Sequence, residues 1–507
     1  MQKQSTFPLG YIKIWLKDKL FLISVAVAFT GIALRLKQYL TNRSLWSDEA
    51  SLALNIVERS FKELAQPLDY HQGAPLGFLW IQKGIVILFG SSEYALRLVP
   101  LICGISSLFI FWFIAAKYLN KRATCLAFTL FAISDLPIYF SSEAKQYSCD
   151  VMVGLLTLVM LFSLTKRNQN LGYLSVIGYG LLGAIFIWMS HPAIFFLGSV
   201  GISVIYGYYV RSEYNKIKYL VLMGSVWVVS FLTFFITSLY NLTQNQYLLN
   251  YWRDGFPPAF SKPLAILEWT IEALLSTFEY PGGLATFGLA AFLYVIGFVV
   301  LYQRDRITLI GLSLPIGFTL LASFLGKYPF SNRLILFIIP LLLIPIAEGA
   351  EQLFALLSTT RFRLAAPVLI GLLLFQPLLT ASNYLFEPRL QEDIRPVIKH
   401  IDDNWREGDI IYVYYGAYGQ FKYYQAVFEF QENSYIKGIE SRQEWVNYLP
   451  DLNALQRHKR VWLLFSHVHS GNGVNEEELF TEWLNRIGGT QKDWFPRTGA
   501  SAYLYEF

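Results

Sequence analysis

The sequence predicts an α-helical polytopic membrane protein of about eleven transmembrane helices, followed by a small extracytoplasmic α/β domain. Of the 507 residues, 54% are hydrophobic and only 15% are charged, whereas soluble globular proteins carry about 25% charged residues. Apolar stretches long enough to cross ~30 Å of hydrocarbon as helices recur through the first three quarters of the chain. Charged residues and alternating strand-like patterns return only in the last quarter.

The expected spans follow from hydropathy and length. The first, around LFLISVAVAFTGIAL at residues 20–34, has no small-residue cleavage site after it, so we expect a retained span and not a removed signal peptide. The spans are expected near residues 18–36, 97–116, 123–140, 147–165, 171–189, 193–210, 217–239, 284–302, 307–325, 332–347 and 364–381.

Basic residues gather in alternate connections between these spans. By the positive-inside rule such connections face the cytoplasm. This puts the amino terminus inside and the carboxyl tail outside, in a membrane that we expect to be the bacterial plasma (inner) membrane. The net charge of +5 is largely this topological signal and needs no nucleic-acid partner. The clusters are Lys3, Lys13, Lys17 and Lys19; Lys117, Lys121 and Arg122; Lys166, Arg167, Arg211, Lys216 and Lys218; Arg304 and Arg306; Arg361 and Arg363.

Residues 1–387 are therefore expected to form the transmembrane domain, with a first outer loop at about 37–96, and residues 388–507 the extracytoplasmic domain. In the tail, IIYVYY, VWLLF and AYLYEF read as strands, whereas RPVIKHIDDNW and EEELFTEWLNRI read as helices. His467 and His469 alternate in SHVHSG without a third ligand nearby, which favours an ordinary loop over a metal site.

The first outer loop contains the acidic stretch SLWSDEASLALN, residues 44–55. Apolar residues recur after Ser47 with helical spacing, which predicts an amphipathic helix along the outer membrane surface. With Ser47 as the N-cap, Asp48 and Glu49 fall in the first turn, where the helix dipole stabilises carboxylates. Acids are common at helix starts, so this pair alone does not identify a site.

Two further outer turns carry charges at the same depth. Glu143 lies in YFSSEAKQY (139–147), and GKYPFSNR (326–333) carries Lys327, Tyr328 and Arg333. Lysines at a membrane boundary are often simple interfacial anchors, because their long side chains snorkel. Arg333 precedes LILFIIPLLLI with no acid nearby in sequence, and its planar guanidinium is suited to bidentate binding of a phosphate.

These motifs in this order resemble the C-type (GT-C) membrane glycosyltransferases. They are the outer Asp-Glu-Ala turn, HQGAPL at 71–76, FGSSEYALR at 89–97, YFSSEAKQY and the YPFSNR turn. The nearest branch is similar to the protein O-mannosyltransferases and lipid A aminoarabinose transferases, that is, glycosyltransferase family 39-like. The resemblance implies a GT-C fold and an inverting glycosyltransferase. Such an enzyme moves a sugar from a polyprenyl-phosphate-linked donor to an acceptor hydroxyl on the extracytoplasmic face.

Carried onto this chain, the family's first-loop acid matches Asp48, with Glu49 beside it, and the second-loop acid matches Glu143. These three are the expected catalytic residues. The family's histidine before Pro-Leu matches His71, although many relatives have a shorter His-Pro-Pro-Leu loop. Relatives also often carry Arg where this chain has Lys145, which keeps the charge but loses the bidentate fork.

The chemistry assigns roles to these groups. Asp48 is the candidate base that deprotonates the acceptor hydroxyl. The leaving phosphate needs its charge held, and the expected phosphate-binding residues are Arg333, Lys327, Tyr328, Lys145 and His71.

Glu143 is expected to orient the acceptor, Asp48 or a lysine. His71 together with the acids could also ligate a divalent metal, which the sequence neither requires nor excludes. The sequence does not identify the acceptor, which could be a lipid, a glycan or a protein. Asp135 is either an extra functional acid or a helix-end residue facing water, and we favour the second reading.

Two alternatives belong to other classes. A transporter or flippase of lipid-linked glycans predicts acids near the bilayer midplane and pseudo-symmetric halves, and the sequence shows neither. A non-catalytic polysaccharide-assembly protein would keep the fold without the chemistry. Retention of Asp48 and Glu143 argues against that second alternative.

Overall fold

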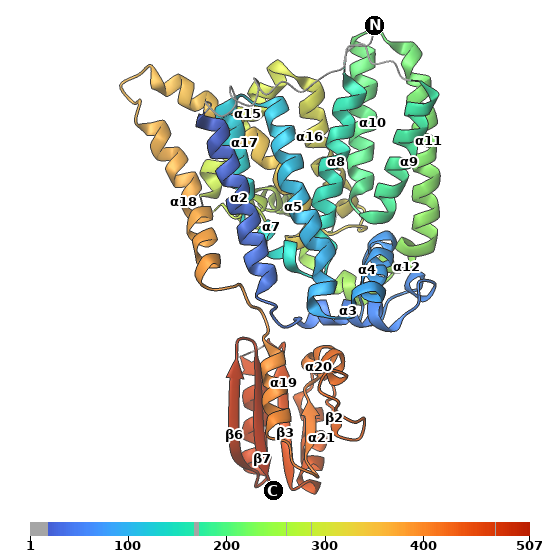
Figure 1. Cartoon of the computed structure of the whole chain (residues 1–507), viewed down its shortest axis with the longest axis vertical. Coiled ribbons are helices and arrows are strands. Elements are labelled where there is room, and N and C mark those ends of the chain that lie inside the picture. The colour runs from blue at the N-terminus through green and yellow to red at the C-terminus, as the bar shows by residue number, and fades with distance from the viewer. Residues whose placement is uncertain (1–18, 167–171, 260, 285, 472) are drawn as a thin grey trace.

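The protein consists of a helical bundle and a C-terminal α/β domain that lies against one end of it (Figure 1). The computed structural model describes residues 19–166, 172–259, 261–284, 286–471 and 473–507. Each part has its own hydrophobic core, because the buried apolar residues fall into one cluster in the bundle and a second cluster in the C-terminal domain.

The bundle confirms the expected polytopic helical fold. Within the described residues, eight helices are long and apolar enough to cross a membrane, and a pair of helices bent by 58° makes a ninth span when the pair is counted as one. Shorter apolar helices occupy the two remaining expected spans. The bundle helices are α2 (Lys19–Leu40), α5 (Glu93–Tyr118), α6 (Lys121–Ala132), α7 (Asp135–Tyr139), α8 (Tyr147–Thr165), α9 (Tyr173–Met189), α10 (Ala193–Val210), α11 (Ile217–Phe234), α15 (Phe287–Arg304), α16 (Arg306–Phe324), α17 (Ile339–Ser358) and α18 (Ala365–Phe386).

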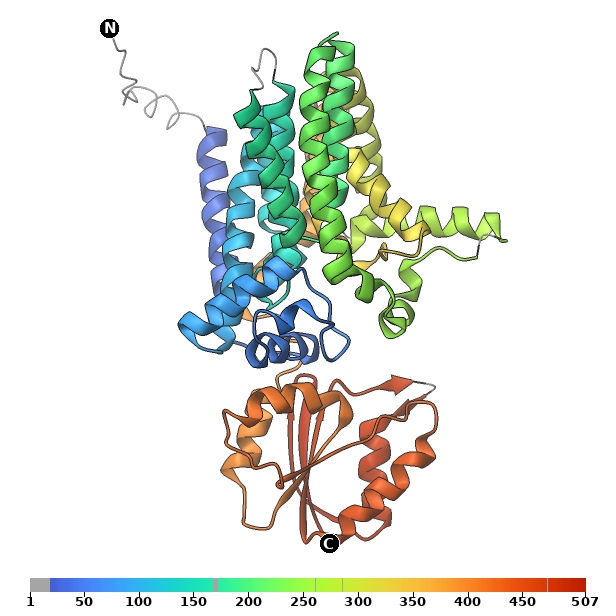
Figure 2. The ribbon, with the colours of Figure 1, turned by 90° about the vertical axis from the view of Figure 1, so that its right-hand side faces the viewer.

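Short helices fill the loops at the end of the bundle that faces the C-terminal domain. Figure 2 shows the first of these loops lying directly between the bundle and the sheet domain. The loop helices are α3 (Ser47–Glu58), α4 (Leu76–Phe89), α12 (Tyr240–Thr243), α13 (Gln246–Tyr251) and α14 (Pro263–Glu279).

The helix that carries the acidic pair is present, but two expectations about it are wrong. It begins at Ser47, so Trp46 and not Ser47 occupies the N-cap, and no side chain of the cap residue bonds the first turn. The Ser47 N–H instead donates to Glu392 Oε2 at 2.8 Å. Residues from Glu49 to Ile56 are buried because α3 packs against α20 (Tyr418–Gln425) of the C-terminal domain. The helix is therefore enclosed between the two parts and does not lie open on a membrane surface.

The C-terminal domain is built on a five-stranded sheet of order β2-β1-β3-β7-β6. β1 pairs in parallel with β2 and β3, whereas β7 is antiparallel to both β3 and β6. The predicted strands at β1, β3 and β7 and the predicted helices at α19 and α22 are confirmed. The strands are β1 (Ile410–Val413), β2 (Tyr435–Lys437), β3 (Arg460–Ser466), β4 (Ser470–Gly471), β5 (Val474–Asn475), β6 (Thr490–Arg497) and β7 (Ala500–Glu506), and the remaining helices are α19 (Ile394–Asp403), α21 (Tyr448–Ala454) and α22 (Glu476–Arg486).

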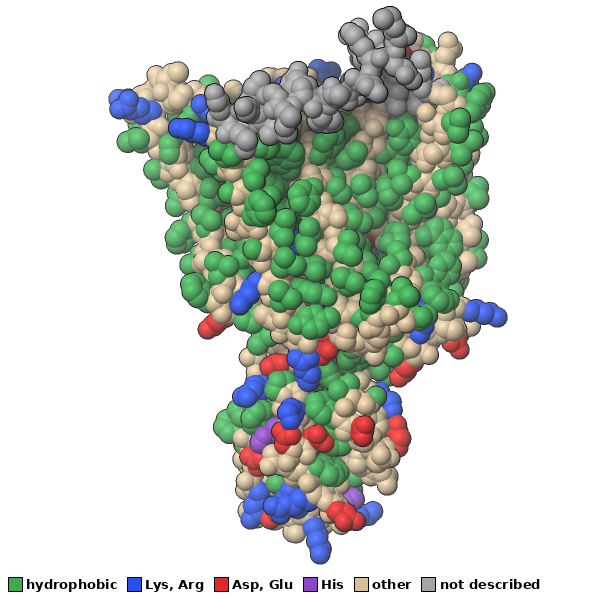
Figure 3. Space-filling model, in the orientation of Figure 1, with side chains coloured by type: hydrophobic (Ala, Val, Ile, Leu, Met, Phe, Trp, Pro, Cys, Tyr) green, Lys and Arg blue, Asp and Glu red, His purple; other side chains and the backbone are tan. Residues whose placement is uncertain are grey.

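Charge is distributed very differently over the two parts. The side of the bundle seen in Figure 3 is a broad apolar surface with few charges, whereas acidic and basic side chains cover the C-terminal domain. This is the surface expected of a multi-pass membrane protein that carries a domain in water. The N-terminal basic residues Lys3, Lys13 and Lys17, and also Arg167, lie outside the described residues. Which end of the bundle faces the cytoplasm stays a prediction.

Asp135 does not simply face water at a helix end, as the sequence suggested. Its carboxylate accepts a hydrogen bond from the Tyr384 hydroxyl at 2.6 Å and pairs with Arg389 at 2.7 Å. Both partners lie at or just after the end of α18, where the chain leaves the bundle. Asp135 therefore ties the bent α6–α7 span to the connection between the two parts of the protein.

Candidate active site

A cavity of roughly 1130 Å³ lies between the C-terminal domain and the end of the bundle that faces it. Its apolar wall comes from bundle helices and includes Phe195, Phe231, Phe318 and Leu321. Its polar wall comes from the loops at this end of the bundle and from the C-terminal domain. The cavity can therefore hold a ligand with an apolar tail on one side and a charged or hydroxylated head on the other.

The charged centre of the cavity is Asp48, held between two cations. Lys145 Nζ lies 2.9 Å from Asp48 Oδ1, and Arg333 Nη2 lies 2.9 Å from Asp48 Oδ2. The Asp48 side chain is 19% exposed, so it is open to the cavity and not sealed in the core. The three residues come from α3, from the turn before α8 and from the 3-10 helix η6 (Asn332–Ile338), which explains why no local motif contains them all.

Aromatic side chains fix the Arg333 guanidinium in place. Its centre lies 5.3 Å from the Trp46 ring centroid and 5.1 Å from that of Trp252. Its Nε donates to the Tyr147 hydroxyl at 2.9 Å. A cation between two ring faces is favourable and preorganised. Arg333 is therefore held ready for an anion while it still has donors to offer.

The protonation of Asp48 follows from its two partners. Burial by itself would raise the pKa of the Asp48 carboxyl, but the charges of Lys145 and Arg333 outweigh burial and lower the pKa to about 2. Burial lowers the pKa of Lys145, and the Asp48 charge opposes that shift. The Asp48 carboxyl is thus ionised at neutral pH and can accept a proton only if its surroundings change.

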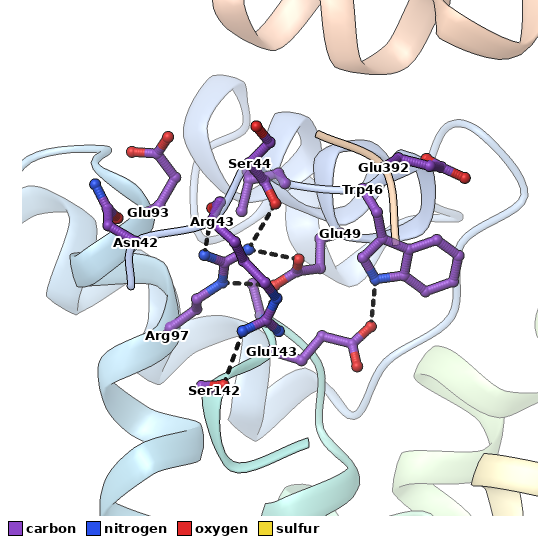
Figure 4. A network of polar contacts seen from close by, with 12 residues as sticks. Asn42, Arg43, Ser44, Trp46, Glu49, Glu93, Arg97, Ser142, Glu143 and Glu392 are labelled. Atoms are coloured by element: carbon purple, nitrogen blue, oxygen red, sulfur yellow. Dashed lines mark hydrogen bonds and ion pairs between the residues drawn. The ribbon is translucent and has the colours of Figure 1, made fainter. Parts of the chain in front are cut away.

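Glu49, the next residue, faces the opposite way and does not line the cavity. It is fully buried and makes a two-point contact with Arg97, at 2.9 Å to Nε and 2.7 Å to Nη2. Its Oε1 also accepts the Ala144 N–H at 2.7 Å. Figure 4 shows Arg97 reaching from this carboxylate back to the loop at Arg43 and Ser44. The contacts place Glu49 in a network that fixes the first loop against α5.

Glu143 is the third predicted catalytic acid, and it too lies behind the cavity wall. Its Oε1 accepts a hydrogen bond from the Trp46 indole at 2.5 Å, whereas Oε2 has no partner among the described residues (Figure 4). Burial, reinforced by the neighbouring Glu49 carboxylate, raises the pKa of Glu143 to about 7. Glu143 therefore does not line the cavity itself. It is linked to the cavity by Trp46, which lines the cavity and whose ring lies against Arg333.

The other predicted phosphate-binding residues line the cavity with unequal geometry. His71 stacks on Tyr247 with ring centroids 4.2 Å apart. Lys327 is exposed, so its amine is free to move toward a ligand. The Tyr328 hydroxyl already donates to the Leu334 carbonyl at 2.7 Å, so Tyr328 offers a ligand mainly its ring. Among the described residues, no three His, Cys, Asp or Glu side chains gather as a metal site.

Several residues of the cavity were missed by the sequence reasoning. Gln72 accepts a hydrogen bond from Lys145 Nζ at 2.5 Å, and the unusually long HQGAPL loop was the only signal for it. Tyr415, Arg442 and His467 reach the cavity from the C-terminal domain. The sequence assigned His467 to an ordinary loop, and no local pattern in the tail could have placed Tyr415 and Arg442 at the cavity, because their position depends on how the domain docks onto the bundle.

The helical bundle, with its acidic loop and appended sheet domain, has the GT-C fold. A family model described as dolichyl-phosphate-mannose-protein mannosyltransferase matches residues 73–241. No curated protein sequence is detectably similar to the chain. The resemblance inferred from the sequence motifs, and the GT-C fold with it, is therefore confirmed by the family model and by the match to ArnT that follows.

Among solved structures, the chain is similar to ArnT from Cupriavidus metallidurans. In the apo state the TM-score is 0.53 at 11% identity, with 98% of each chain covered. For ArnT bound to undecaprenyl phosphate the TM-score is 0.51 at 10% identity, again with 98% of each chain covered. A third match, the archaeal oligosaccharyltransferase AglB from Archaeoglobus fulgidus, has a TM-score of 0.48 at 13% identity and covers 95% of this chain and 74% of that one. That last similarity is too low to carry an argument.

Proposed function

We propose that the protein is an inverting glycosyltransferase that moves a sugar from a polyprenyl-phosphate donor to an acceptor hydroxyl on the extracytoplasmic face. The observation that carries this proposal is Asp48 held between Lys145 and Arg333 on the wall of a cavity that is apolar on its bundle side. A lipid phosphate matches that wall, because its tail is apolar and its head is anionic. One of the similar structures, ArnT, is described as bound to undecaprenyl phosphate, which supports a donor of this class.

In the proposed reaction the acceptor oxygen attacks the anomeric carbon as its proton passes to Asp48. The bond between the anomeric carbon and the phosphate oxygen breaks, and the electron pair leaves on the polyprenyl phosphate. A single displacement inverts the configuration and needs one base. The leaving phosphate needs no proton but needs its growing charge held, which Arg333 and Lys145 can do.

The low pKa of Asp48 has a consequence for this mechanism. A carboxylate with a pKa of about 2 is a weak base. When a donor phosphate enters, it competes for the same two cations, Lys145 and Arg333. We expect the pKa of Asp48 to rise as its partners turn to the phosphate, so that the base is activated only when donor is bound. Before then the ion pairs keep the site from acting on water.

The C-terminal domain is the proposed entry side for the acceptor. Tyr415, Arg442 and His467 line the cavity opposite the bundle, and Arg442 Nε donates to the Tyr415 hydroxyl at 3.0 Å. Hydroxyl, guanidinium and imidazole groups are suited to hydroxylated or anionic acceptors. The acceptor remains a lipid, a glycan or a protein in this proposal.

The proposal is tested by incubating the purified protein in lipid bilayers with a panel of polyprenyl-phosphate sugars and candidate acceptors, and measuring released polyprenyl phosphate. We expect release from at least one donor, with loss in Asp48→Asn and a reduced rate in Arg333→Ala. Glu351→Gln is the matched control, because Glu351 lies in α17 near Arg122 and away from the cavity. No release from any donor, by a protein that also fails to bind undecaprenyl phosphate, would contradict the proposal.

A further inference from the structure

One part of the cavity wall contains buried polar atoms that have no hydrogen-bond partner among the described residues. Among the described residues, Gln146 Oε1 and His191 Nε2 have no hydrogen-bond partner, and the Asp150 carboxyl, whose Oδ1 is otherwise unbonded, interacts with the Ser190 side chain. Gln146, Asp150 and His191 line the cavity. Gln146 and Asp150 are each only 5% exposed. Buried polar groups are nearly always hydrogen-bonded in a working protein, so this wall is shaped for an occupant that supplies the missing bonds.

The fold brings these groups together from two elements. The Asp150 N–H donates to the Gln146 carbonyl at 2.9 Å, so the two residues stand one helical turn apart at the start of α8. Ser190 and His191 form the turn between α9 and α10, and α10 packs against α8. The Gln146 amide nitrogen donates to the Gly73 carbonyl at 3.5 Å. The Gln146 amide oxygen is therefore the atom that can accept a hydrogen bond from a ligand.

This wall differs in chemistry from the charged centre beside it. At the centre, Asp48 is fully paired with Lys145 and Arg333. The unpaired wall presents mainly acceptors: a carboxyl oxygen, an amide oxygen and, in one tautomer, a ring nitrogen. An isoprenoid tail has nothing to donate to them. The phosphodiester of a polyprenyl-phosphate sugar has no proton to donate to them either.

We propose that Gln146, Asp150 and His191 form the subsite that binds the hydroxyl groups of the donor sugar and thereby selects which sugar is transferred. This inference rests on the proposed function. Of the three parts of a polyprenyl-phosphate sugar, only the sugar carries several hydroxyl donors. Asp150 lies about 6 Å along the axis of α8 from Gln146, four residues at 1.5 Å each, which matches the size of a single sugar ring. The subsite borders Tyr147, whose hydroxyl bonds Arg333, so it adjoins the expected phosphate position.

The test compares two ligands that differ only in the sugar. Dissociation constants are measured in lipid nanodiscs for undecaprenyl phosphate and for a panel of undecaprenyl-phosphate sugars, including deoxy analogues of the preferred one. We expect the wild-type protein to bind its preferred sugar-bearing lipid about 10- to 100-fold more tightly than the bare lipid phosphate, as hydrogen bonds to charged or buried partners would give. We expect the deoxy analogue at the bound hydroxyl to lose most of that gain.

The variants Asp150→Asn and His191→Phe keep the size of each side chain and change its hydrogen bonding. We expect both to lose the preference for the sugar-bearing lipid while their affinity for bare undecaprenyl phosphate stays within about twofold of wild type. Arg333→Ala should instead weaken both ligands equally. Glu351→Gln is again the control, and thermal unfolding in detergent confirms that each variant is folded.

The outcomes separate this inference from the proposed function. If the lipid phosphate binds and Asp150→Asn and His191→Phe keep the wild-type sugar preference, the subsite inference is wrong and the proposed function stands. If wild type binds the bare and the sugar-bearing lipids equally, the wall holds water and the inference is also wrong. If the preference disappears on adding a chelator, a cation occupies these groups, which again overturns it. If no lipid phosphate binds at all, the proposed function fails as well.

Discussion

Two ion-pair centres stand side by side in this protein, and they differ in what surrounds them. In the cavity, Asp48 lies between Lys145 and Arg333 with 19% of its side chain exposed. Behind the wall, Glu49 and Arg97 form a pair with side chains 0% and 2% exposed. The two acids are neighbours in sequence, but the helix turns them to opposite sides. The difference shows that adjacent acids of one motif can have entirely different surroundings. We propose that the acid open to the cavity serves chemistry and that the buried acid serves folding.

The largest expected effect is on the buried centre. Arg97→Leu leaves the Glu49 carboxylate buried without its counterion, and removing one partner of a buried pair costs about 3–5 kcal/mol. We expect the variant to accumulate poorly and to unfold at a much lower temperature in detergent. The double variant Glu49→Gln with Arg97→Leu should recover part of the loss, since no unpaired charge remains. A near-native unfolding temperature for Arg97→Leu would contradict the proposal that the Glu49–Arg97 pair stabilises the fold.

A smaller effect is expected at the cavity centre, and on binding instead of folding. Arg333→Ala removes charge-assisted hydrogen bonds worth about 1.5–3 kcal/mol, so the Kd for undecaprenyl phosphate should rise roughly 10- to 100-fold. Arg333→Lys keeps the charge without the fork and should recover only part of the affinity. Calorimetry or fluorescence titration in nanodiscs measures both. Unchanged affinity in Arg333→Ala would mean that the phosphate is held elsewhere.

The protonation of Glu143 provides a pH test that distinguishes the buried centre from the cavity. Its pKa is raised from 4.5 to about 7 in the folded protein, so its contribution to stability is present below pH 4.5 and is lost as the pH rises to about 7. The lowered pKa of Asp48 acts in the opposite sense, because its contribution is lost only as the pH falls toward 2. We expect the unfolding temperature of Glu143→Gln to fall less than that of wild type between pH 4.5 and 7. Parallel curves would show that the pKa of Glu143 is not raised in the folded protein.

The smallest effect is expected where the C-terminal domain holds the acidic helix. Glu392 Oε2 accepts the Ser47 N–H, and Oε1 lies 2.6 Å from His467 Nδ1. Loss of a helix cap costs about 1 kcal/mol, so Glu392→Ala should lower stability modestly and reduce turnover by misplacing Asp48. The hydrogen bond to Glu392 raises the pKa of His467, so this contribution is lost as the pH rises through that raised value. A stability loss that is the same at all pH values would indicate that His467 takes no part.

Sequence reasoning recovered the parts of the fold that depend on local pattern. Each span expected from hydropathy corresponds to an apolar helix or to the bent helix pair of the bundle. The strands β1, β3 and β7 were predicted from strand-like residue patterns. It missed β6, because most side chains of that strand are exposed and show no apolar alternation. It also misplaced α3, since an amphipathic pattern shows that one face is buried but not whether a second domain covers the other face.

The candidate site was predicted in part for the same reason. The sequence predicted that the turns carrying Asp48, Lys145 and Arg333 lie at the same depth in the membrane. In the structure these three side chains are in contact. Their partners could not be assigned, because Arg333 lies 285 positions from Asp48 in the chain. The different surroundings of Asp48 and Glu49 could not be predicted either, because they depend on Arg97 of α5 packing against Glu49. Contacts from the C-terminal domain carried no sequence signal.

The central claim is that Asp48 performs chemistry while Glu49 maintains the fold, and one paired measurement tests it most directly. Asp48→Asn and Glu49→Gln are purified together, and each is assayed for thermal unfolding in detergent and for polyprenyl phosphate release with the preferred donor. The account predicts that Asp48→Asn unfolds near the wild-type temperature and loses about 100-fold or more of its activity, whereas Glu49→Gln is clearly destabilised. An active Asp48→Asn protein, or a stable and inactive Glu49→Gln protein, would contradict it.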